Sequence, residues 1–280
     1  LNFFKAVKII LTKDKNYPDI LVLEMAADRP GDIKYLTSFA HPDVAVVTAI
    51  GEMPVHLEFF PERDAYVGEK ANIIKSLKPG GTAVLNYDDL SVREFRDRVT
   101  SGRSRIYYGF QEGADVRISD FSYNIPASCG EIEKSGMEFS VEYLGDSAGG
   151  GELLESTRSK INKVLGIPPL YAVLSGIAVG TAFGIKIADS AKSLEKFSVP
   201  KNRLELSKGV KNTIIINDSY NSSPVACEAA LDLLSKFKKQ RKIAVLGSMR
   251  ELGKNTEEAH RMIGKKASKI SDIVFLVGDE

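Results

Sequence analysis

Three side chains that can bind a metal ion follow apolar segments in the first quarter of the chain. Glu24 ends the apolar run 20–25, His56 comes after the run 44–48 and a loop, and Lys70 lies on the helical pattern that follows. In open α/β sheets the ligand crevice lies outside the carboxyl ends of the strands, so these side chains can converge there. A buried carboxylate is costly unless it is paired or bound to metal. We predict that the three side-chain ends meet within about 10 Å, the scale of a two-metal cluster.

Each of the three residues also has an ordinary interpretation. Glu24 can be a surface or salt-bridged strand end, His56 a loop histidine, and Lys70 a solvated position on a helix. Taken alone, they indicate only a two-domain α/β protein that binds a nucleotide or another small molecule.

The common phosphate and zinc motifs are absent from the sequence. The segment 247–255 (GSMRELGKN) imitates the loop G-x-x-x-x-G-K-[ST], but it has one residue too many between its glycines. It also has Asn255 where that loop needs a hydroxyl for magnesium. No G-x-G-x-x-G follows a predicted strand. The three histidines and two cysteines are widely dispersed, which argues against a zinc site.

The elements that must position these residues form a βαβ pattern. The runs 20–25, 44–48 and 82–86 are short and continuously apolar, as strands of a buried parallel sheet are. Apolar residues over 64–77 predict a helix, and the turn 78–81 ends it.

The pattern changes twice along the rest of the chain. Alternation within 115–143 predicts a hairpin or a small antiparallel layer, 170–183 predicts a buried helix, and 198–202 has the composition of a linker. Beyond the linker, strands are predicted at 213–216, 242–247 and 272–277, and helices at 224–237 and 256–268. We therefore predict two α/β units, residues 1–198 and 199–280, with a boundary between about 195 and 211.

Composition limits the partners that this chain can have. Its 280 residues, 43% of them hydrophobic, suffice for two domains. The 38 basic and 37 acidic residues nearly balance, so neither nucleic acid nor an anionic membrane is expected as a partner. No apolar run reaches the roughly 20 residues that span a bilayer, and no signal peptide is recognisable. Cys129 and Cys227 are distant in sequence. A single bridge between them is possible, but two free thiols in a cytoplasmic protein are the better interpretation.

Several short segments of the sequence give further evidence about the fold and the function. In the first unit these are VLEMAADRPGDI (22–33), PDVAVVTAIG (42–51), VHLEFF (55–60), EKANII (69–74) and PGGTAVLNYDD (79–89). In the second they are NRLE (202–205), INDSYNSSP (216–224) and AVLGSMRELG (244–253), with His260 beyond. Together they resemble the central and C-terminal domains of the Mur ligase family, most closely the branch that adds D-alanyl-D-alanine.

This resemblance implies a fold and a reaction. The fold would be a P-loop-NTPase-like central domain with a parallel sheet and a small antiparallel layer, followed by an incomplete Rossmann-like domain. The enzyme would be an ATP-dependent amide ligase that activates a carboxylate as an acyl phosphate. Its partners would be a UDP-linked muramoyl peptide and D-alanyl-D-alanine or an amino acid, and we expect a monomer.

The resemblance also implies roles for individual residues. Glu24, His56 and a carbamylated Lys70 would bind Mg²⁺, with His56 and Lys70 as catalytic residues. The ATP contacts implied by the family lie at Asn86, Arg203, Asp218 and Asn221.

Departures from the family pattern leave two alternatives open. The segment 166–172 (GIPPLYA) lacks the histidine and asparagines that contact adenine in the family, Asn72 replaces a glutamate, and Ser248 replaces an aspartate. A non-catalytic relative that acts as a binding module, or a ligase resembling folylpolyglutamate synthase, would also share the fold. The family's phosphate loop would precede Leu1 and more of the C-terminal domain would follow Glu280. We therefore expect residues 1–280 alone not to transfer phosphate from ATP.

Overall fold

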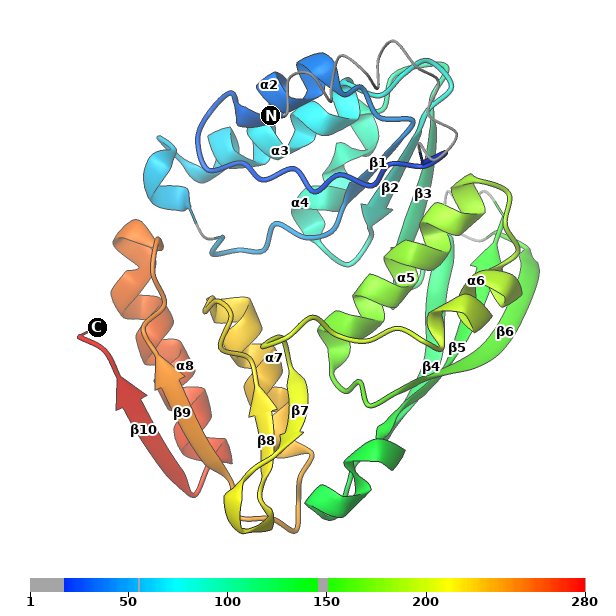
Figure 1. Cartoon of the computed structure of the whole chain (residues 1–280). Coiled ribbons are helices and arrows are strands. Elements are labelled where there is room, and N and C mark those ends of the chain that lie inside the picture. Colours follow the sequence, from blue (N-terminus) through cyan, green and yellow to red (C-terminus); the bar gives the residue numbers. More distant parts are fainter. Residues whose placement is uncertain (1–17, 55, 146–150, 280) are drawn as a thin grey trace, which may run out of the picture.

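The first part of the chain is built on a mixed six-stranded sheet. The computed structural model describes residues 18–54, 56–145 and 151–279. The strands lie in the order β1-β2-β3-β4-β5-β6 (Figure 1), and neighbours are parallel from β1 to β4 and antiparallel from β4 to β6. Their bounds are β1 Val44–Val47, β2 Thr82–Asn86, β3 Ser104–Gly109, β4 Val116–Asn124, β5 Gly136–Leu144 and β6 Leu153–Asn162.

Helices cover both faces of the parallel strands (Figure 1). On one face Ala83 and Leu85 of β2 lie in an apolar cluster with Ala71 and Ile74. On the other face Val84 belongs to a cluster that includes the helix after β6. Burial on both faces explains why the sequence of β2 is continuously apolar. The helices of this part are α2 Asp32–Phe39, α3 Arg63–Lys75, α4 Leu90–Arg93, α5 Ile167–Ala182 and α6 Ile187–Leu194, with 3-10 turns η1 Leu57–Phe59, η2 Glu94–Arg98 and η3 Cys129–Lys134.

The second part carries separate, smaller sheets. Strands β7 and β8 pair antiparallel, and β9 and β10 pair parallel. Helices α7 and α8 pack on each other and enclose a core of small and aliphatic side chains beside β9. The bounds are β7 Glu205–Lys208, η4 Val210–Asn212, β8 Ile214–Asn217, α7 Pro224–Ser235, β9 Ile243–Gly247, η5 Gly253–Asn255, α8 Thr256–Ile270 and β10 Ile273–Val277. No strand pairing among the described residues joins the two parts, which we call the first and second units; their boundary near residue 199 stays an interpretation.

The α/β class predicted from the sequence is confirmed, and several strand assignments need correction. The run 20–25 forms no strand, and Val22 is 88% exposed, because no described strand pairs with it to satisfy its backbone groups. Strands β3, β6 and β7 were not predicted. In the second half of β6 exposure alternates, with Arg158 and Lys160 exposed and Ser159 and Ile161 buried. The predicted antiparallel layer is continuous with the parallel sheet rather than separate from it. Within the described residues no helix is both long and apolar enough to span a membrane.

Candidate metal and nucleotide site

The loop between β1 and α3 carries His56, and the first unit holds the start of this loop through side chains. Asn86 donates to the carbonyl of Thr48 at 2.7 Å. The Asp89 carboxylate accepts from the N–H groups of Ile50 and Gly51 at 2.7 and 2.9 Å. Because backbone donors and acceptors are both satisfied, the loop leaves the sheet in one defined direction.

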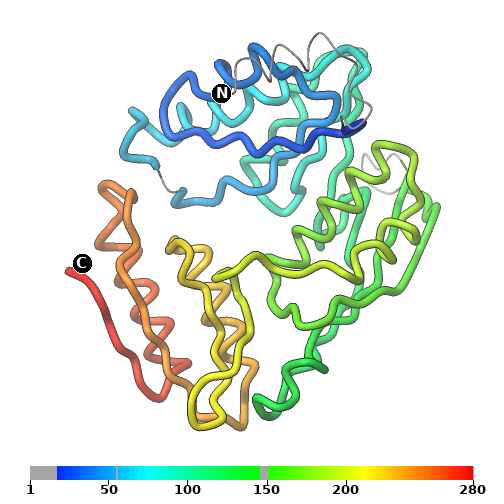
Figure 2. Tube along the Cα trace, viewed as in Figure 1, coloured from blue at the N-terminus to red at the C-terminus, as the bar shows by residue number. Residues whose placement is uncertain are grey.

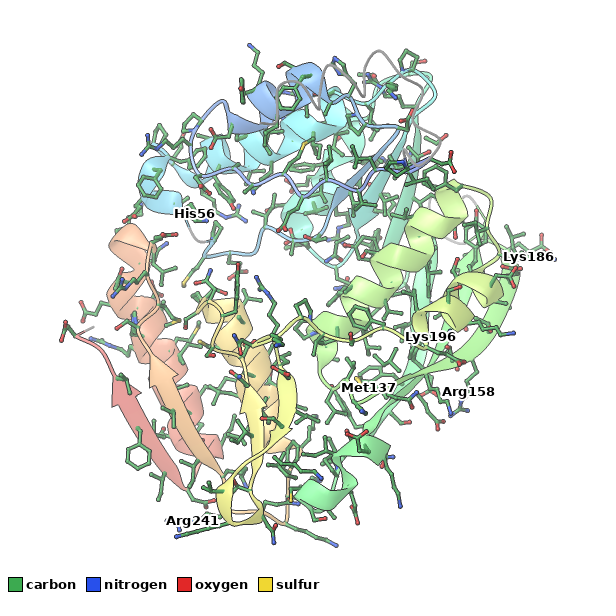
Figure 3. The ribbon with its side chains drawn as sticks, in the orientation of Figure 1. His56, Met137, Arg158, Lys186, Lys196 and Arg241 are labelled. Atoms are coloured by element: carbon green, nitrogen blue, oxygen red, sulfur yellow. The ribbon has the colours of Figure 1, made fainter. Side chains whose placement is uncertain are left out.

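His56 lies where this loop meets the second unit (Figure 3). Its Nδ1 is 2.7 Å from an oxygen of Glu251, and its Nε2 is 3.6 Å from an oxygen of Asp28. The backbone of His56 is left-handed, with φ of 66°, which is uncommon for a residue with a side chain. Such a conformation costs on the order of 1 kcal/mol or more and persists where surrounding contacts determine it.

Lys70 lies on α3, half-buried beside acidic groups. Its ammonium lies 5.4 Å from the centre of the Tyr66 ring. Burial lowers the pKa of Lys70, and the negative charges of Asp28, Glu69 and Glu24 oppose this shift. Glu24 therefore acts electrostatically on the same amine as Asp28.

Asp28 links the two neighbourhoods, and the fold of segment 28–33 explains its place. The Asp32 carboxylate accepts from the N–H of Asp28 at 3.0 Å, and buried Glu69 accepts from Ile33 at 2.8 Å. These bonds fold the segment onto α3, which puts Asp28 near both His56 and Lys70. The sequence analysis quoted this segment without singling out Asp28. An acidic residue four positions after Glu24 was the available signal.

An open pocket of about 440 Å³ lies at His56 and draws residues from both units. Its lining consists of Asp28, Arg29, Asp32, His56, Phe59 and Glu251. Carboxylate oxygens with one imidazole suit a divalent cation such as Mg²⁺, so the donors fit the metal that the sequence implied. Among the described residues, however, no three His, Cys, Asp or Glu side chains are already arranged as a metal site. The convergence of Glu24, His56 and Lys70 on one point stays a prediction.

The residues predicted to contact ATP are held by local bonds. Asn86 is buried and also accepts from the N–H of Asp88 at 3.0 Å. In the second unit, Asp218 accepts from the N–H of Leu204 at 3.0 Å, and burial raises the pKa of its carboxyl. The Arg203 guanidinium lies 4.3 Å from the centre of the Tyr220 ring. Their roles toward a nucleotide stay predictions.

Asn221 is the last of the residues predicted to contact ATP, and segment 166–172 is the place where the family's adenine contacts are missing. The Asn221 side chain accepts from the N–H of Ser222 at 2.9 Å. Segment 166–172 forms the start of α5, where Pro168 and Pro169 occupy first-turn positions that lack an intrahelical donor. In this segment the Tyr171 hydroxyl donates to Asp88 at 2.7 Å, which attaches the helix to the end of the sheet.

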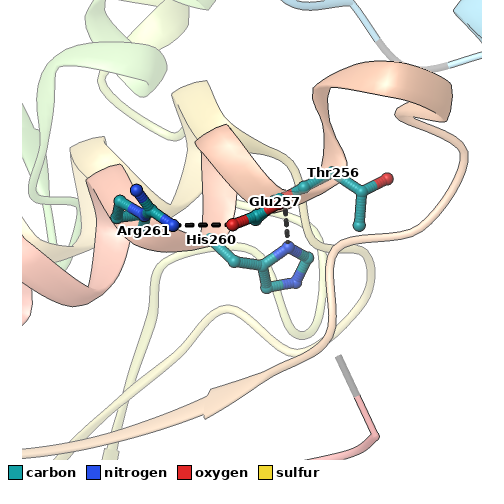
Figure 4. Close-up of a pocket in the computed structure, with 4 residues that line it drawn as sticks. All are labelled: Thr256, Glu257, His260 and Arg261. Atoms are coloured by element: carbon teal, nitrogen blue, oxygen red, sulfur yellow. Dashed lines mark hydrogen bonds and ion pairs between the residues drawn. The ribbon is translucent and has the colours of Figure 1, made fainter.

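The segment that carries Glu251 is braced by His260 of α8. The N–H of Met249 donates to His260 Nε2 at 2.9 Å. His260 Nδ1 donates to the carbonyl of Thr256 at 2.7 Å, as Figure 4 shows. Both ring nitrogens of His260 are therefore used within the second unit, and this histidine serves structure rather than metal binding.

We expect His260→Ala to lower the free energy of unfolding by about 1 to 3 kcal/mol, because the buried Met249 N–H would lose its acceptor. The measurement is urea denaturation followed by circular dichroism. Arg261→Ala is the matched control, since Arg261 forms an exposed ion pair with Glu257 (Figure 4) and its replacement should change stability little. Equal losses in the two variants would contradict the proposed brace.

The chain matches two family models and is similar to several known proteins. The family model of the Mur ligase middle domain matches residues 4–147, and that of the Mur ligase glutamate ligase domain matches residues 202–280. The UDP-N-acetylmuramoyl-tripeptide–D-alanyl-D-alanine ligase of Bacillus subtilis is 32% identical over 93% of this chain and 51% of its own length. The ligase of the same name from Mycobacterium leprae is 28% identical over 92% and 50%. The chain thus spans about half the length of these relatives.

A solved structure shows the same likeness. The MurF ligase of Thermotoga maritima, solved in complex with ADP, superimposes with a TM-score of 0.77 at 29% identity. The alignment covers 95% of this chain and 56% of that protein.

Proposed function

Because the chain belongs to the Mur ligase family of ATP-dependent amide ligases, we propose that it is the central and C-terminal part of a D-alanyl-D-alanine-adding enzyme. Its acceptor would be a UDP-N-acetylmuramoyl tripeptide, a precursor of peptidoglycan. The observation that carries the proposal is the acidic pocket at His56, beside the half-buried Lys70, in a chain that shares both domains with ligases of this name.

The proposed reaction proceeds in two steps. A carboxylate oxygen of the tripeptide attacks the γ-phosphorus of ATP, the bond to the β-phosphate oxygen breaks, and ADP leaves. The amine of D-alanyl-D-alanine then attacks the acyl carbon, the carbon–oxygen bond to phosphate breaks, and the nitrogen loses a proton. Both steps depend on positioning and charge neutralisation more than on covalent help from the protein.

The residues of the pocket suit the charge-neutralising part of this task. Mg²⁺, when bound, would neutralise the phosphate oxygens. Glu24, Asp28 and His56 would hold it, with Lys70 after carbamylation. Across the unit boundary, Arg203 would face the phosphates and Asp218 the ribose. The position of the Arg203 guanidinium over the Tyr220 ring supports this role, because the contact with the ring face holds the guanidinium in one place.

Lys70 has the environment that carbamylation requires. The neutral amine attacks CO₂ and loses a proton, so a lowered pKa makes more reactive amine available as the pH rises through that lowered value. We expect a carbamate resonance in ¹³C NMR spectra of the protein equilibrated with ¹³C-bicarbonate. The resonance should strengthen with Mg²⁺, because three nearby carboxylates repel an uncompensated carbamate.

The matched controls are Lys70→Arg and Lys75→Arg on the same helix. Lys75 is exposed and donates to Asn72, so its replacement should leave the resonance intact, whereas Lys70→Arg should abolish it. A resonance that survives Lys70→Arg would rule out carbamylation at this position.

One observation favours a second candidate, a non-catalytic binding module. The start of α5, where the family's adenine contacts are missing, is occupied by prolines and by the bonded Tyr171. The decisive assay supplies the native protein with ATP, the UDP-linked tripeptide and D-alanyl-D-alanine, and measures phosphate and amide product. The proposal expects phosphate release that needs both acceptor and dipeptide. No release would favour the second candidate, and equal release without the two substrates would contradict both candidates.

A further inference from the structure

The histidine of the proposed metal site is held by a carboxylate from the other unit. Glu251 follows β9 and reaches across to His56 Nδ1 at 2.7 Å. Its neighbours Met249 and Leu252 are each 1% exposed and anchor the segment in the core of the second unit. Glu251 itself has a left-handed backbone, with φ of 64°, and its side chain is 43% exposed toward the pocket. The fold thus fixes both backbones and leaves this carboxylate facing the imidazole.

The contact determines what the imidazole can do. A carboxylate accepts hydrogen bonds, so Nδ1 must carry the proton that Glu251 receives. In the neutral ring Nε2 then keeps its lone pair, and that nitrogen is the one directed toward Asp28. Metal-binding histidines typically donate their other N–H to a carboxylate in this way, which orients the ring and increases its basicity.

The loop of His56 reaches this carboxylate only because it docks on the second unit. Met53 packs against the second unit's core, which includes Leu252. A carbon at the Cβ position of Gly253 would lie 3.5 Å from Glu58, so the two loops are in close contact there. Figure 2 shows the loop between β1 and α3 beside the turn that precedes α8.

We propose that Glu251 is a positioning residue for the metal-binding nitrogen of His56, and that it acts only while the two units are docked. This inference rests on the proposed function, since it assigns His56 to a metal site. If Glu251 has this role, the orientation of the His56 ring depends on how the two units dock, because His56 and Glu251 come from different units.

The test compares the native protein with Glu251→Ala and Glu251→Leu, which both remove the acceptor. Long-range ¹H–¹⁵N NMR spectra report which imidazole nitrogen carries the proton, and His56→Ala assigns the signals. We expect the Nδ1–H form of His56 in the native protein and its loss in Glu251→Ala. Mn²⁺ binding, followed by electron paramagnetic resonance, should weaken about 10-fold in Glu251→Ala, as it typically does when a metal-binding histidine loses the group that orients it. Glu257→Gln removes one acidic charge from the exposed face of α8 and should change neither signal.

The outcomes separate the inference from the proposed function. An unchanged tautomer and unchanged Mn²⁺ affinity in Glu251→Ala, with a fold intact by circular dichroism, would overturn the inference. A native His56 ring protonated on both nitrogens would also overturn it, because the contact would then be an ion pair with no free lone pair. If His56→Ala leaves Mn²⁺ binding unchanged while Glu251→Ala still shifts the tautomer, Glu251 orients the ring but the metal site of the proposed function is wrong. If Glu251→Ala unfolds the second unit, Glu251→Leu decides, since it keeps most of the side-chain size and offers no acceptor. Loss of the Nδ1–H form in Glu251→Leu would support the inference, and its retention would overturn it.

Discussion

Asp88→Ala is expected to lower the free energy of unfolding by about 3 to 5 kcal/mol, because one carboxylate accepts three hydrogen bonds. The donors are the N–H of Phe110 at 2.7 Å, the N–H of Gln111 at 3.1 Å and the hydroxyl of Tyr171 at 2.7 Å. Removing the carboxylate would leave the partly buried donors of Phe110 and Tyr171 without this partner, whereas the exposed N–H of Gln111 can turn to water. Urea denaturation followed by circular dichroism measures the change.

The matched control is Tyr171→Phe, which removes only one of the three hydrogen bonds. It should cost about 1 kcal/mol, and the hydroxyl of Tyr171, whose pKa is raised by burial and by Asp88, is neutral at ordinary pH. Equal costs for the two variants would show that the backbone N–H groups do not depend on Asp88. The expected difference matters for function, because Asp88 attaches the divergent start of α5 to the end of β2.

The close approach at Asp88 also explains a glycine. A Cβ atom at residue 109 would lie 2.7 Å from an oxygen of the Asp88 carboxylate, nearer than side-chain carbons normally come. The chain therefore needs glycine at the end of β3 for Asp88 to reach the loop beyond it.

The sequence predicted those elements whose burial repeats a simple pattern. Strand β2 was predicted because helices cover both of its faces, so every residue from Ala83 to Leu85 is apolar. The run 20–25 has the same composition but no partner among the described strands, and composition cannot reveal whether a ladder partner exists. Strand β6 has a different composition, with the exposed charges Arg158 and Lys160 on one face, and it contains no apolar run from which to predict a strand.

The sequence predicted only those site residues that lie on or directly after a predicted element. His56 and Lys70 stand out because they follow predicted strands or lie on a predicted helix. Glu251 lies 195 positions beyond His56, and no spacing rule connects residues in separate units. Its contact depends on how the units dock, which only the tertiary structure shows. Asn86 was predicted from the family as a nucleotide contact, and its bonds to Thr48 and Asp88 show a structural task that the resemblance did not indicate.

Met53→Asp is expected to detach the His56 loop from the second unit, because it places a carboxylate against an apolar cluster. The substitution should cost the docking of the His56 loop at least about 3 kcal/mol. This cost shifts the equilibrium between the docked and the detached loop by roughly 100-fold toward the detached form. Hydrogen exchange measured by mass spectrometry should rise in segments 51–60 and 249–255 and stay unchanged in β2 and α5. Met53→Leu conserves the volume and should leave exchange near the native level.

This substitution separates docking from the chemistry of Glu251. It leaves His56, Glu251 and Asp28 in place, so we attribute a change at the imidazole to the lost contact between the His56 loop and the second unit. The units also pack through Leu204, Leu233 and Phe237, away from this loop. We expect Met53→Asp to remove the Nδ1–H form of His56 as Glu251→Ala does, and Met53→Leu to preserve it. Faster exchange with an unchanged His56 tautomer would mean that the first unit orients the ring by itself, through Asp28 and the stacking of the ring on Phe59 at 6.5 Å. The second unit would then contribute to the reaction only through its proposed nucleotide contacts, Arg203 and Asp218.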